Sequence, residues 1–494
     1  MGITDFARGR IRTLFGAVIA ATLLLPLAPP AMAEAKEEAV HGGGGFFSKF
    51  YPLGQRRPVS RLSDEYIPFR SVAEVPPRLK LLFELGNPFL EVGNLTPGIN
   101  LPGGAVWQPR LWVFGTYRSA LQSFDPGTTL RTTEWVNRFD LFANLQLTNT
   151  EKMVLSIRPL DHNRFGQFSG YNIENRADTS SDWNNEFDTS VRTFFFEGDF
   201  GSLVPNLDPE GIRPIDFGFT IGRQPFLFQD GILLNDTLDA FGIIRNNIRF
   251  GGISGMRLAA LWAWGDLDRN DTRRDPQPNL FSLNTSIDTW RRTVEADLLY
   301  VDDDTANGDA WYFSALSTQT IGNFNTTFRF NSSFAEDADT SSVADGFLVA
   351  AEISWTPHHS DDIVYINPFW AIESFTQAGR EPIAGGSLAP LGIMFASNNI
   401  GNFRSELSNA TSEVAGIAMG YQAFFDNFRR NLILEVAARV DTSGDSTGRD
   451  DYAVGFQLQQ KLKQRYLVQL DGFFSLRDKR DDAFGWRTEL LIQF

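Results

Sequence analysis

Arginines and carboxylates that recur at every second position are the side chains with the clearest capacity for chemistry. Arg138 and Asp140 form one such pair, and Arg487 and Glu489 form another near the end of the chain. Arginine stays charged at any working pH and offers a planar fork that matches carboxylate or phosphate oxygens. Rings of such charges can select ions in a pore, but arginines can also pair with neighbouring acids and only brace a wall. The residue types leave both interpretations open.

Alternation along the predicted strands assigns a larger set of charged residues to one face. The residues expected to line a pore are Arg118, Arg138, Asp140, Arg158, Arg192, Arg257, Arg291, Glu295, Arg329, Glu352, Glu435, Arg439, Asp471, Arg477, Arg487 and Glu489. Arginine accounts for 37 of the 44 basic residues, although the formal net charge of the chain is −16. An inner face richer in arginine than the rest of the chain predicts some preference for anions.

Enzymatic chemistry finds little support in the sequence. The four histidines are His41, His162, His358 and His359, and none lies in a predicted strand beside a candidate serine nucleophile. The chain has no cysteine, so it has neither a disulfide framework nor a thiolate metal site. Neither a complete calcium loop nor a nucleotide-binding glycine motif is present. We therefore expect no catalytic residue, no cofactor and no metal, and the acidic charge disfavours nucleic acid as a partner.

The elements that would position these charges are strands with one apolar face. In residues 483–494, Trp486, Leu490 and Phe494 share one parity, while Arg487 and Glu489 share the other. Successive side chains of a strand point to opposite faces. The same alternation recurs in residues 134–147, 293–300, 432–440 and 467–477. Each segment has about the ten residues that cross a bilayer at a tilt.

Seventeen alternating segments can be counted between residues 110 and 494, joined by short turns and by long polar connections at 161–190, 265–288 and 376–413. Backbone groups in lipid must all be paired within the protein, so a spanning sheet has to close on itself. The predicted fold is a single all-β, closed antiparallel transmembrane β-barrel. Because bacterial barrels have even strand counts, we expect eighteen strands, with sixteen as the alternative. Counting the predicted strands places connection 265–288 at the opposite end of the barrel from the other two long connections.

The sequence before the strands divides into two parts. Arg8, Arg10 and Arg12 precede an apolar run, and an Ala31-Met32-Ala33 stretch fits a cleavage site. We therefore expect a signal peptide at 1–33, an irregular periplasmic or lumen-associated leader at 34–108, and the barrel at 109–494. Connection 376–413 contains the apolar run LAPLGIMF. That run predicts either an inward constriction or an outward cover with a small packed cluster.

A short motif adds a family resemblance. Residues 216–250 contain Gly222, Arg223 and Gln224 at the end of a predicted strand, followed by Asp230 and Gly231 in a loop. This arrangement resembles the alginate-export family of Gram-negative outer-membrane barrels. The resemblance implies a monomeric, porin-like barrel of eighteen strands whose arginine-rich lumen passes an acidic polysaccharide.

Together these features predict a channel in the cell outer membrane for passive passage of charged solutes, with an anionic polysaccharide as the solute that the resemblance suggests. The expected partners are outer-membrane lipid and these solutes. Two alternatives stay open. One is a non-conducting structural or assembly barrel that is plugged by its leader. The other is a soluble periplasmic β-protein that binds carbohydrate, which would bury the apolar parity instead of exposing it.

Overall fold

The computed structural model describes residues 78–90, 97–127, 131–162, 167–174, 182–210, 215–269, 273–275, 278–305, 307–336, 340, 342–444 and 450–494. The predicted signal peptide at 1–33 and most of the predicted leader lie outside these residues. The part of the chain from Lys49 onward contains the whole sheet and is described here by itself.

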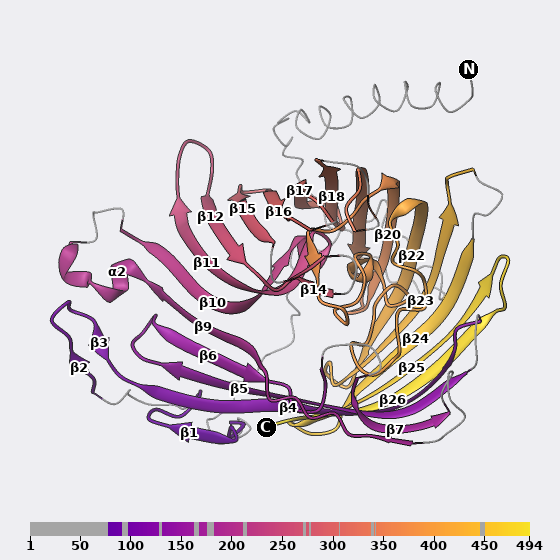
Figure 1. The fold of residues 1–494 in the computed structure, drawn as a ribbon, viewed down its shortest axis with the longest axis horizontal. Coiled ribbons are helices and arrows are strands. Elements are labelled where there is room, and N and C mark those ends of the chain that lie inside the picture. Colours follow the sequence, from indigo (N-terminus) through magenta and orange to yellow (C-terminus); the bar gives the residue numbers. More distant parts are fainter. Residues whose placement is uncertain are drawn as a thin grey trace, which may run out of the picture. The chain divides into compact units, whose positions relative to one another are not determined.

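Eighteen antiparallel strands form one closed barrel (Figure 1). In chain order they are β4 (Arg110–Asp125), β5 (Thr132–Gln146), β6 (Lys152–Ile157), β9 (Val191–Asp199), β10 (Phe217–Phe228), β11 (Leu234–Ile248), β12 (Gly255–Trp264), β15 (Asn279–Asp288), β16 (Arg292–Asp302), β17 (Ala310–Ile321), β18 (Phe324–Ala335), β19 (Gly346–Trp355), β20 (Ile363–Ser374), β22 (Ser412–Phe425), β23 (Arg430–Asp441), β24 (Asp451–Lys461), β25 (Tyr466–Arg477) and β26 (Ala483–Gln493). Each strand pairs with the next, and β26 pairs with β4, with Glu489 opposite Ala120. The predicted closed fold with eighteen strands is confirmed.

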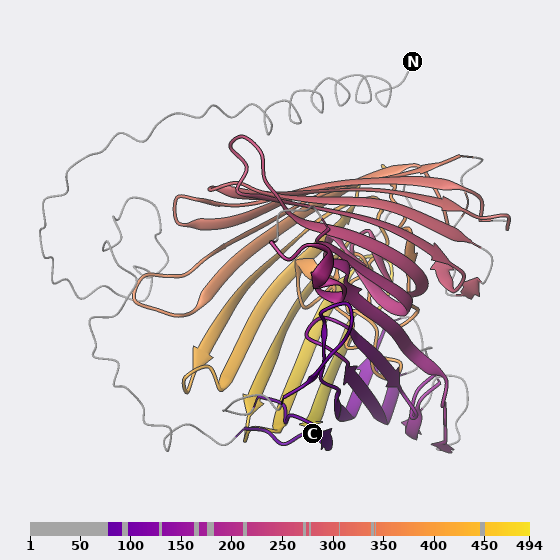
Figure 2. The ribbon, with the colours of Figure 1, turned by 90° about the vertical axis from the view of Figure 1, so that its left-hand side faces the viewer.

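The two parities of the strands have opposite environments. In β26, the relative exposures of Phe484, Trp486 and Leu490 are 43%, 41% and 37%. Those of Arg487 and Glu489 are only 1% and 3%. Large apolar side chains therefore face outward, and charged side chains face the interior. The soluble alternative required these apolar residues to be buried, so the exposed apolar surface argues against it. Figure 2 shows the tilted strands that carry this surface.

Strand β15 corrects the expectation for residues 265–288. The connection ends at residue 278, and Asn279–Asp288 form a full strand between β12 and β16. Phe281 and Leu283 lie outward on this strand, and Ser282 is buried on the inner side. The segment was missed because serine, asparagine and threonine fill most of its other positions. Adding this strand places all three long connections at the same end of the barrel, opposite the end that holds Arg110 and Phe494.

The short elements lie in the connections and in the leader before β4. The strands are β1 (Phe83–Leu85), β2 (Ile99–Asn100), β3 (Val106–Trp107), β7 (Ser169–Glu174), β8 (Asp182–Asn184), β13 (Leu267–Arg269), β14 (Arg273–Asp275) and β21 (Gly379–Arg380). The helical turns are α2 (Phe200–Leu203), η3 (Pro205–Leu207), η4 (Gln229–Gly231) and η5 (Ala389–Leu391). Within the described residues, no helix has the length and apolar character needed to span a membrane.

The described part of the leader packs at the barrel end that holds Phe494. Phe83 of β1 pairs with Val113, on the part of β4 that extends beyond the end of β26. The β2–β3 hairpin contacts the connection between β9 and β10, where the amide of Asn206 donates to the carbonyl of Gly103 at 3.1 Å. These leader residues therefore lie along the rim. The prediction that the leader plugs the lumen falls mainly on residues outside the described part.

Candidate channel lumen

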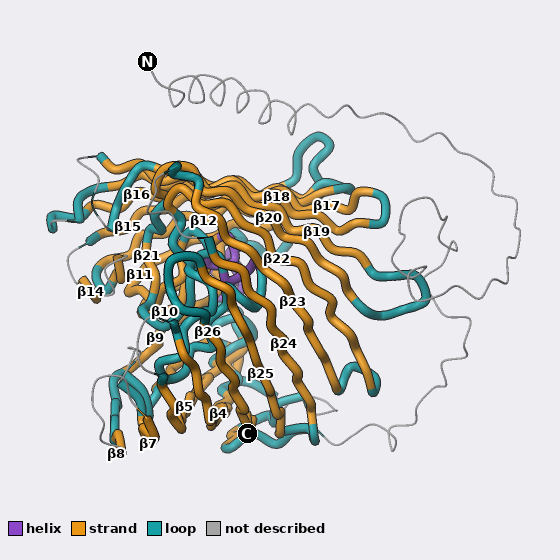
Figure 3. The backbone as a smooth tube through the Cα atoms, turned by 90° about the vertical axis from the view of Figure 1, so that its right-hand side faces the viewer, coloured by secondary structure: helices purple, strands orange, loops and turns teal. Residues whose placement is uncertain are grey.

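The connection between β20 and β22, residues 375–411, folds into the barrel (orange in Figure 1) and is here called the lumen loop; Figure 3 shows the strands of the wall. Arg118 of β4 donates to the carbonyl of Asn398 at 3.0 Å, and Arg138 of β5 donates to the carbonyl of Asn399 at 2.8 Å. On another part of the wall, Glu435 of β23 accepts from the amides of residues 393 and 394 at 2.9 and 2.8 Å. The lumen loop is thus held by two parts of the wall, which are separated by β24, β25 and β26.

The apolar run of the lumen loop is buried against the inner wall. Leu388, Leu391 and Phe395 are fully buried and belong to the main hydrophobic cluster of the molecule. The ring of Phe395 lies 5.4 Å from that of Phe369 on β20, edge to face. This packing explains why a loop inside a barrel carries the sequence LAPLGIMF. The interior is therefore partly a dry core. Of the two arrangements predicted for the apolar run, an inward constriction and an outward cover, the structure has the inward one.

The hairpin of β10 and β11 bends away from the barrel wall, and both strands leave the wall at the same height. β10 pairs with β9 only as far as Arg223, and β11 pairs with β12 only from Ala240 onward. Gly222 sits at this level with a φ of +120°, and a Cβ there would collide with the carbonyl oxygen of Phe194. Only glycine adopts this backbone conformation without strain. Beyond this point the two strands pair only with each other and with β21.

The tip of this hairpin reaches across to the inner wall. The amide of Gln229 donates to Asp297 of β16 at 2.6 Å. Asp230 forms an ion pair with Arg329 of β18, which also binds Glu352 of β19 at 2.7 Å. Of the residues expected to line a pore, Arg329 and Glu352 therefore anchor the hairpin.

The hairpin and the lumen loop are joined to each other. β21 pairs in parallel with Leu234 and Asn235 of β11. Arg380 donates to the carbonyls of Gly231 and Gly385, the latter at 3.0 Å. Burial lowers the pKa of Arg380 to about 10, partly offset by Asp236, so its guanidinium is still charged at neutral pH. One connected structure thus crosses the bore.

Several predicted residues form an ion network on the wall. Arg118 binds Glu489 at 2.5 Å, Arg487 binds Glu489 at 2.7 Å, and Arg487 also binds Asp471 at 2.8 Å. The network links β4, β26 and β25. Each buried charge has an opposite partner, which is the condition under which buried charges are tolerated.

A row of arginines continues from this network along the wall. Arg118 and Arg138 are direct cross-strand partners. Asp140 accepts from both Arg138 and Arg158 at 2.8 Å. Arg192 is the next arginine of the row, and its charge interacts with that of Arg158. Two arginines of this row thus share the carboxylate of Asp140, whereas Arg192 pairs with Asp188 at 3.3 Å.

Other predicted residues hold the lumen loop. Arg439 donates to the carbonyl of Ala410 at 3.1 Å, and Arg477 binds Glu406 at 2.8 Å. Burial raises the pKa of Glu406 above its usual range, although Ser475 and Arg477 act in the opposite direction. Glu435, described above, has the same anchoring role.

Arg291 is not on the wall, and the prediction for it needs correction. It lies in the turn before β16, and its guanidinium stacks over the ring of Trp290 at 4.5 Å. The alternation was extended past the end of the strand, where parity no longer defines a face. By contrast, Arg257 and Glu295 do lie on the inner parity of β12 and β16.

The motif residues Gly222, Arg223, Gln224, Asp230 and Gly231 all belong to the inward hairpin. Arg223 lies on the outer parity and binds Asp239 at 2.8 Å. The motif is therefore a structural element of the bend and tip.

Sequence reasoning missed several residues of the interior. Glu134 accepts from the amide of Asn402 at 2.7 Å and so fixes the lumen loop to β5. Arg269 and Asp303 form a fully buried pair at 3.0 Å in two connections. Alternation could have included Glu134, which shares the parity of Arg138, but no periodicity identifies contacts between connections. Among the described residues no group of three potential ligands could hold a metal ion.

Comparison with known proteins bears on the fold. Crystal structures of Acinetobacter baumannii OccAB3 and of Pseudomonas aeruginosa OccK7 (OpdD) and OccK9 (OpdG) each superpose with a TM-score of 0.51. Each match covers 78% of this chain, with 99% of OccAB3 and 98% of the other two, at sequence identities of 11%, 9% and 10%. These structures are outer-membrane porins. The chain has the outer-membrane porin fold.

The porin fold agrees with the predicted location in the cell outer membrane. The structural neighbours are channels and not enzymes. No protein-family model matches the chain, and no curated protein matches it in sequence. The alginate-export family specifically is therefore not supported.

Replacement of Gly222 by valine should weaken the inward hairpin. A β-branched residue at a φ of +120° is strained and meets the backbone of Phe194. Such strain costs about 1–3 kcal/mol per residue. We expect Gly222→Val to lower the urea concentration at which the purified barrel unfolds. Gly255→Val is the matched control, because a Cβ at Gly255 meets no atom within 4 Å. Equal loss in both variants would contradict the role assigned to Gly222.

Proposed function

We propose that the protein is a passive outer-membrane channel for small charged solutes. The observation that carries this proposal is the arrangement inside the barrel, where the lumen loop and the hairpin narrow a bore whose remaining wall carries an arginine row. Such a constriction admits small solutes and can filter them by charge. Conductance of the purified protein in a planar bilayer tests this function directly. Absence of conductance would favour the non-conducting structural barrel.

The arginine row supports a preference for anions. Arg138 and Arg158 share the single carboxylate of Asp140, whereas Arg192 pairs with Asp188 and Arg118 with Glu489. A surplus of charge of one sign along a narrow, low-dielectric bore raises the local concentration of counter-ions.

Reversal potentials in a KCl gradient should therefore indicate chloride preference. Replacing Arg158 by glutamine should reduce the chloride-to-potassium permeability ratio by roughly twofold, since one positive charge leaves the row. Arg430→Gln is the control, because Arg430 is exposed at the end of β23 and binds Asp426 and Gln460. Cation selectivity of the unmodified protein would defeat the anion preference.

An acidic polysaccharide is a second candidate solute, favoured by the resemblance of residues 216–250 to the alginate-export family. Passage of a polymer would require the lumen loop to leave the bore, so block of the current by oligouronates of increasing length would test it. We further propose that residues 1–33 are a signal peptide, that 34–108 form a leader, and that the barrel of residues 109–494 acts as a monomer. Mass spectrometry of the exported protein tests cleavage after Ala33.

A further inference from the structure

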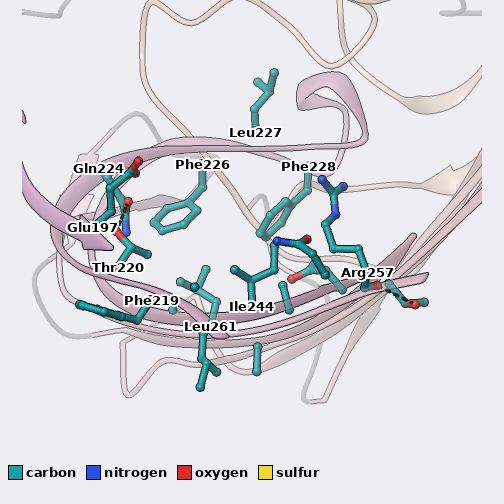
Figure 4. A pocket seen from close by; sticks show the side chains of 18 of the residues that line it. Glu197, Phe219, Thr220, Gln224, Phe226, Leu227, Phe228, Ile244, Arg257 and Leu261 are labelled. Carbon is teal, nitrogen blue, oxygen red and sulfur yellow. Dashed lines mark hydrogen bonds between the residues drawn. The ribbon is translucent and has the colours of Figure 1, made fainter. Parts of the chain in front are cut away.

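A cavity of about 580 Å³ lies beneath the inward hairpin (Figure 4). Its roof is formed by the rings of Phe226 and Phe228, which lie 6.2 Å apart and point into the space, while Leu227 between them points away. Ile244 of β11 and Leu261 of β12 form the apolar wall opposite. A cavity of this size and lining fits a small solute with an apolar part.

Arg257 and Glu295 are two charged residues of opposite sign in the lining of this cavity, which also includes Glu197, Asp199 and Asp297. Arg257 is opposite Ser286 in the β12–β15 pair, and Ser286 is opposite Glu295 in the β15–β16 pair. The two charged residues are therefore at the same level on strands two positions apart, with backbones about 10 Å from each other. Their charges interact. The interval between them is wide enough for a ligand that contacts both.

Arg257 and Glu295 differ from the other charged residues of the wall. Within the described residues, the side chains of both lack a hydrogen bond or an ion pair, whereas Arg118, Arg138 and Arg487 are each bound to a carboxylate. Arg257 is also exposed to the lumen. The cavity thus presents a free guanidinium and a free carboxylate beside an apolar surface.

Two buried amides at the cavity have incomplete hydrogen bonding. Gln224 accepts from Thr220 at 2.7 Å, but its Nε2 has no partner among the described residues. Gln229 donates to Asp297 at 2.6 Å, but its Oε1 has no partner there either. Buried polar atoms without partners are costly, so a polar group of a ligand that reached them would bind favourably.

We infer that this cavity binds a small zwitterion with an apolar side chain, of the kind represented by an apolar α-amino acid. Its carboxylate would bind Arg257, its ammonium would bind Glu295, and its side chain would lie against Phe226 and Phe228. An anion alone would leave Glu295 without a partner, and a cation alone would do the same to Arg257. The inference rests on the proposed channel function, because the solute reaches the cavity through the lumen.

Calorimetric titration of the full-length protein in lipid nanodiscs tests this inference. The probe is L-phenylalanine, compared with 3-phenylpropionate, which lacks the ammonium, and 2-phenylethylamine, which lacks the carboxylate. We expect L-phenylalanine to bind about tenfold more tightly than either analogue, since each charged hydrogen bond contributes on that order. Equal affinities for the three compounds would overturn the inference.

Variants assign the two charges separately. Arg257→Gln should remove the preference for L-phenylalanine over 2-phenylethylamine and keep that over 3-phenylpropionate. Glu295→Gln should remove the preference over 3-phenylpropionate and keep that over 2-phenylethylamine. Phe228→Ala should weaken the binding of all three compounds. Arg430→Gln, an exposed arginine of another strand, should change none of them. Uniform losses in both charge variants would contradict the assigned contacts.

Planar-bilayer conductance of the same purified protein distinguishes this inference from the channel function. A protein that conducts ions but does not bind L-phenylalanine would overturn the inference alone. Absence of conductance would overturn the channel function.

Discussion

Deletion of residues 384–398 should raise the single-channel conductance several-fold. The segment contains Leu388, Leu391 and Phe395, which fill the interior against the wall, and its removal would open the bore. Current through a pore is limited by its narrowest part, so removal of a constriction has a large effect. Planar-bilayer recording of the deletion variant measures this. Unchanged conductance in a correctly folded variant would contradict the constriction.

A milder variant tests the same constriction in case the deletion variant does not fold. Glu435→Ala removes the carboxylate that accepts from the amides of Ile393 and Met394. The lumen loop should then move more freely, and the open-channel current should fluctuate more and have a higher mean. Arg430→Gln on the same strand is the control, because it does not contact the lumen loop. A steady current equal to that of the control would contradict anchoring by Glu435.

Removal of Glu489 should produce the largest loss of barrel stability. Its carboxylate pairs with both Arg118 and Arg487. Without Glu489, Arg487 would keep Asp471, but Arg118 would have no carboxylate partner among the described residues. Breaking a buried ion pair leaves an uncompensated charge and costs about 3–5 kcal/mol. Glu489→Ala should therefore reduce the free energy of unfolding in urea by that order. Unfolding is monitored by the heat-dependent mobility of the barrel in gels.

A matched surface pair provides the control for Glu489. Asp426 pairs with Arg430 at 3.2 Å, and both side chains are about half exposed. Exposed pairs contribute about 0–1 kcal/mol. Asp426→Ala should thus leave stability nearly unchanged. Similar losses for Asp426→Ala and Glu489→Ala would show that the buried network does not stabilise the wall.

The barrel could be predicted from the sequence because strand alternation has a period of two, and one face must meet lipid. That rule assigned Trp486 and Glu489 to opposite faces and gave closure between the last strand and the first. It failed for Asn279–Asp288, where polar residues on both faces masked the strand. It also failed at Arg291, where the strand had already ended.

The inner architecture could be predicted only in part. The apolar run in 376–413 indicated an inward or packed connection, because water does not favour such a run. The inward bend of the β10–β11 hairpin could not be predicted, since its alternation is the same inside and outside the wall. Nor could parity predict that Arg439 and Arg477 bind the lumen loop. Those contacts depend on residues distant in sequence.

The lumen loop also has a mechanical consequence. A bare β-cylinder resists squeezing only through bending of its sheet, because nothing connects the two sides. Here the lumen loop binds Arg138 on β5, and the hairpin joined to it binds Arg329 on β18, nine strands away. The two connections together act as a cross-brace. Lateral pressure from a thicker or stiffer bilayer would then be transmitted to the loop, so the lipid composition of the membrane should alter the bore as well as the wall.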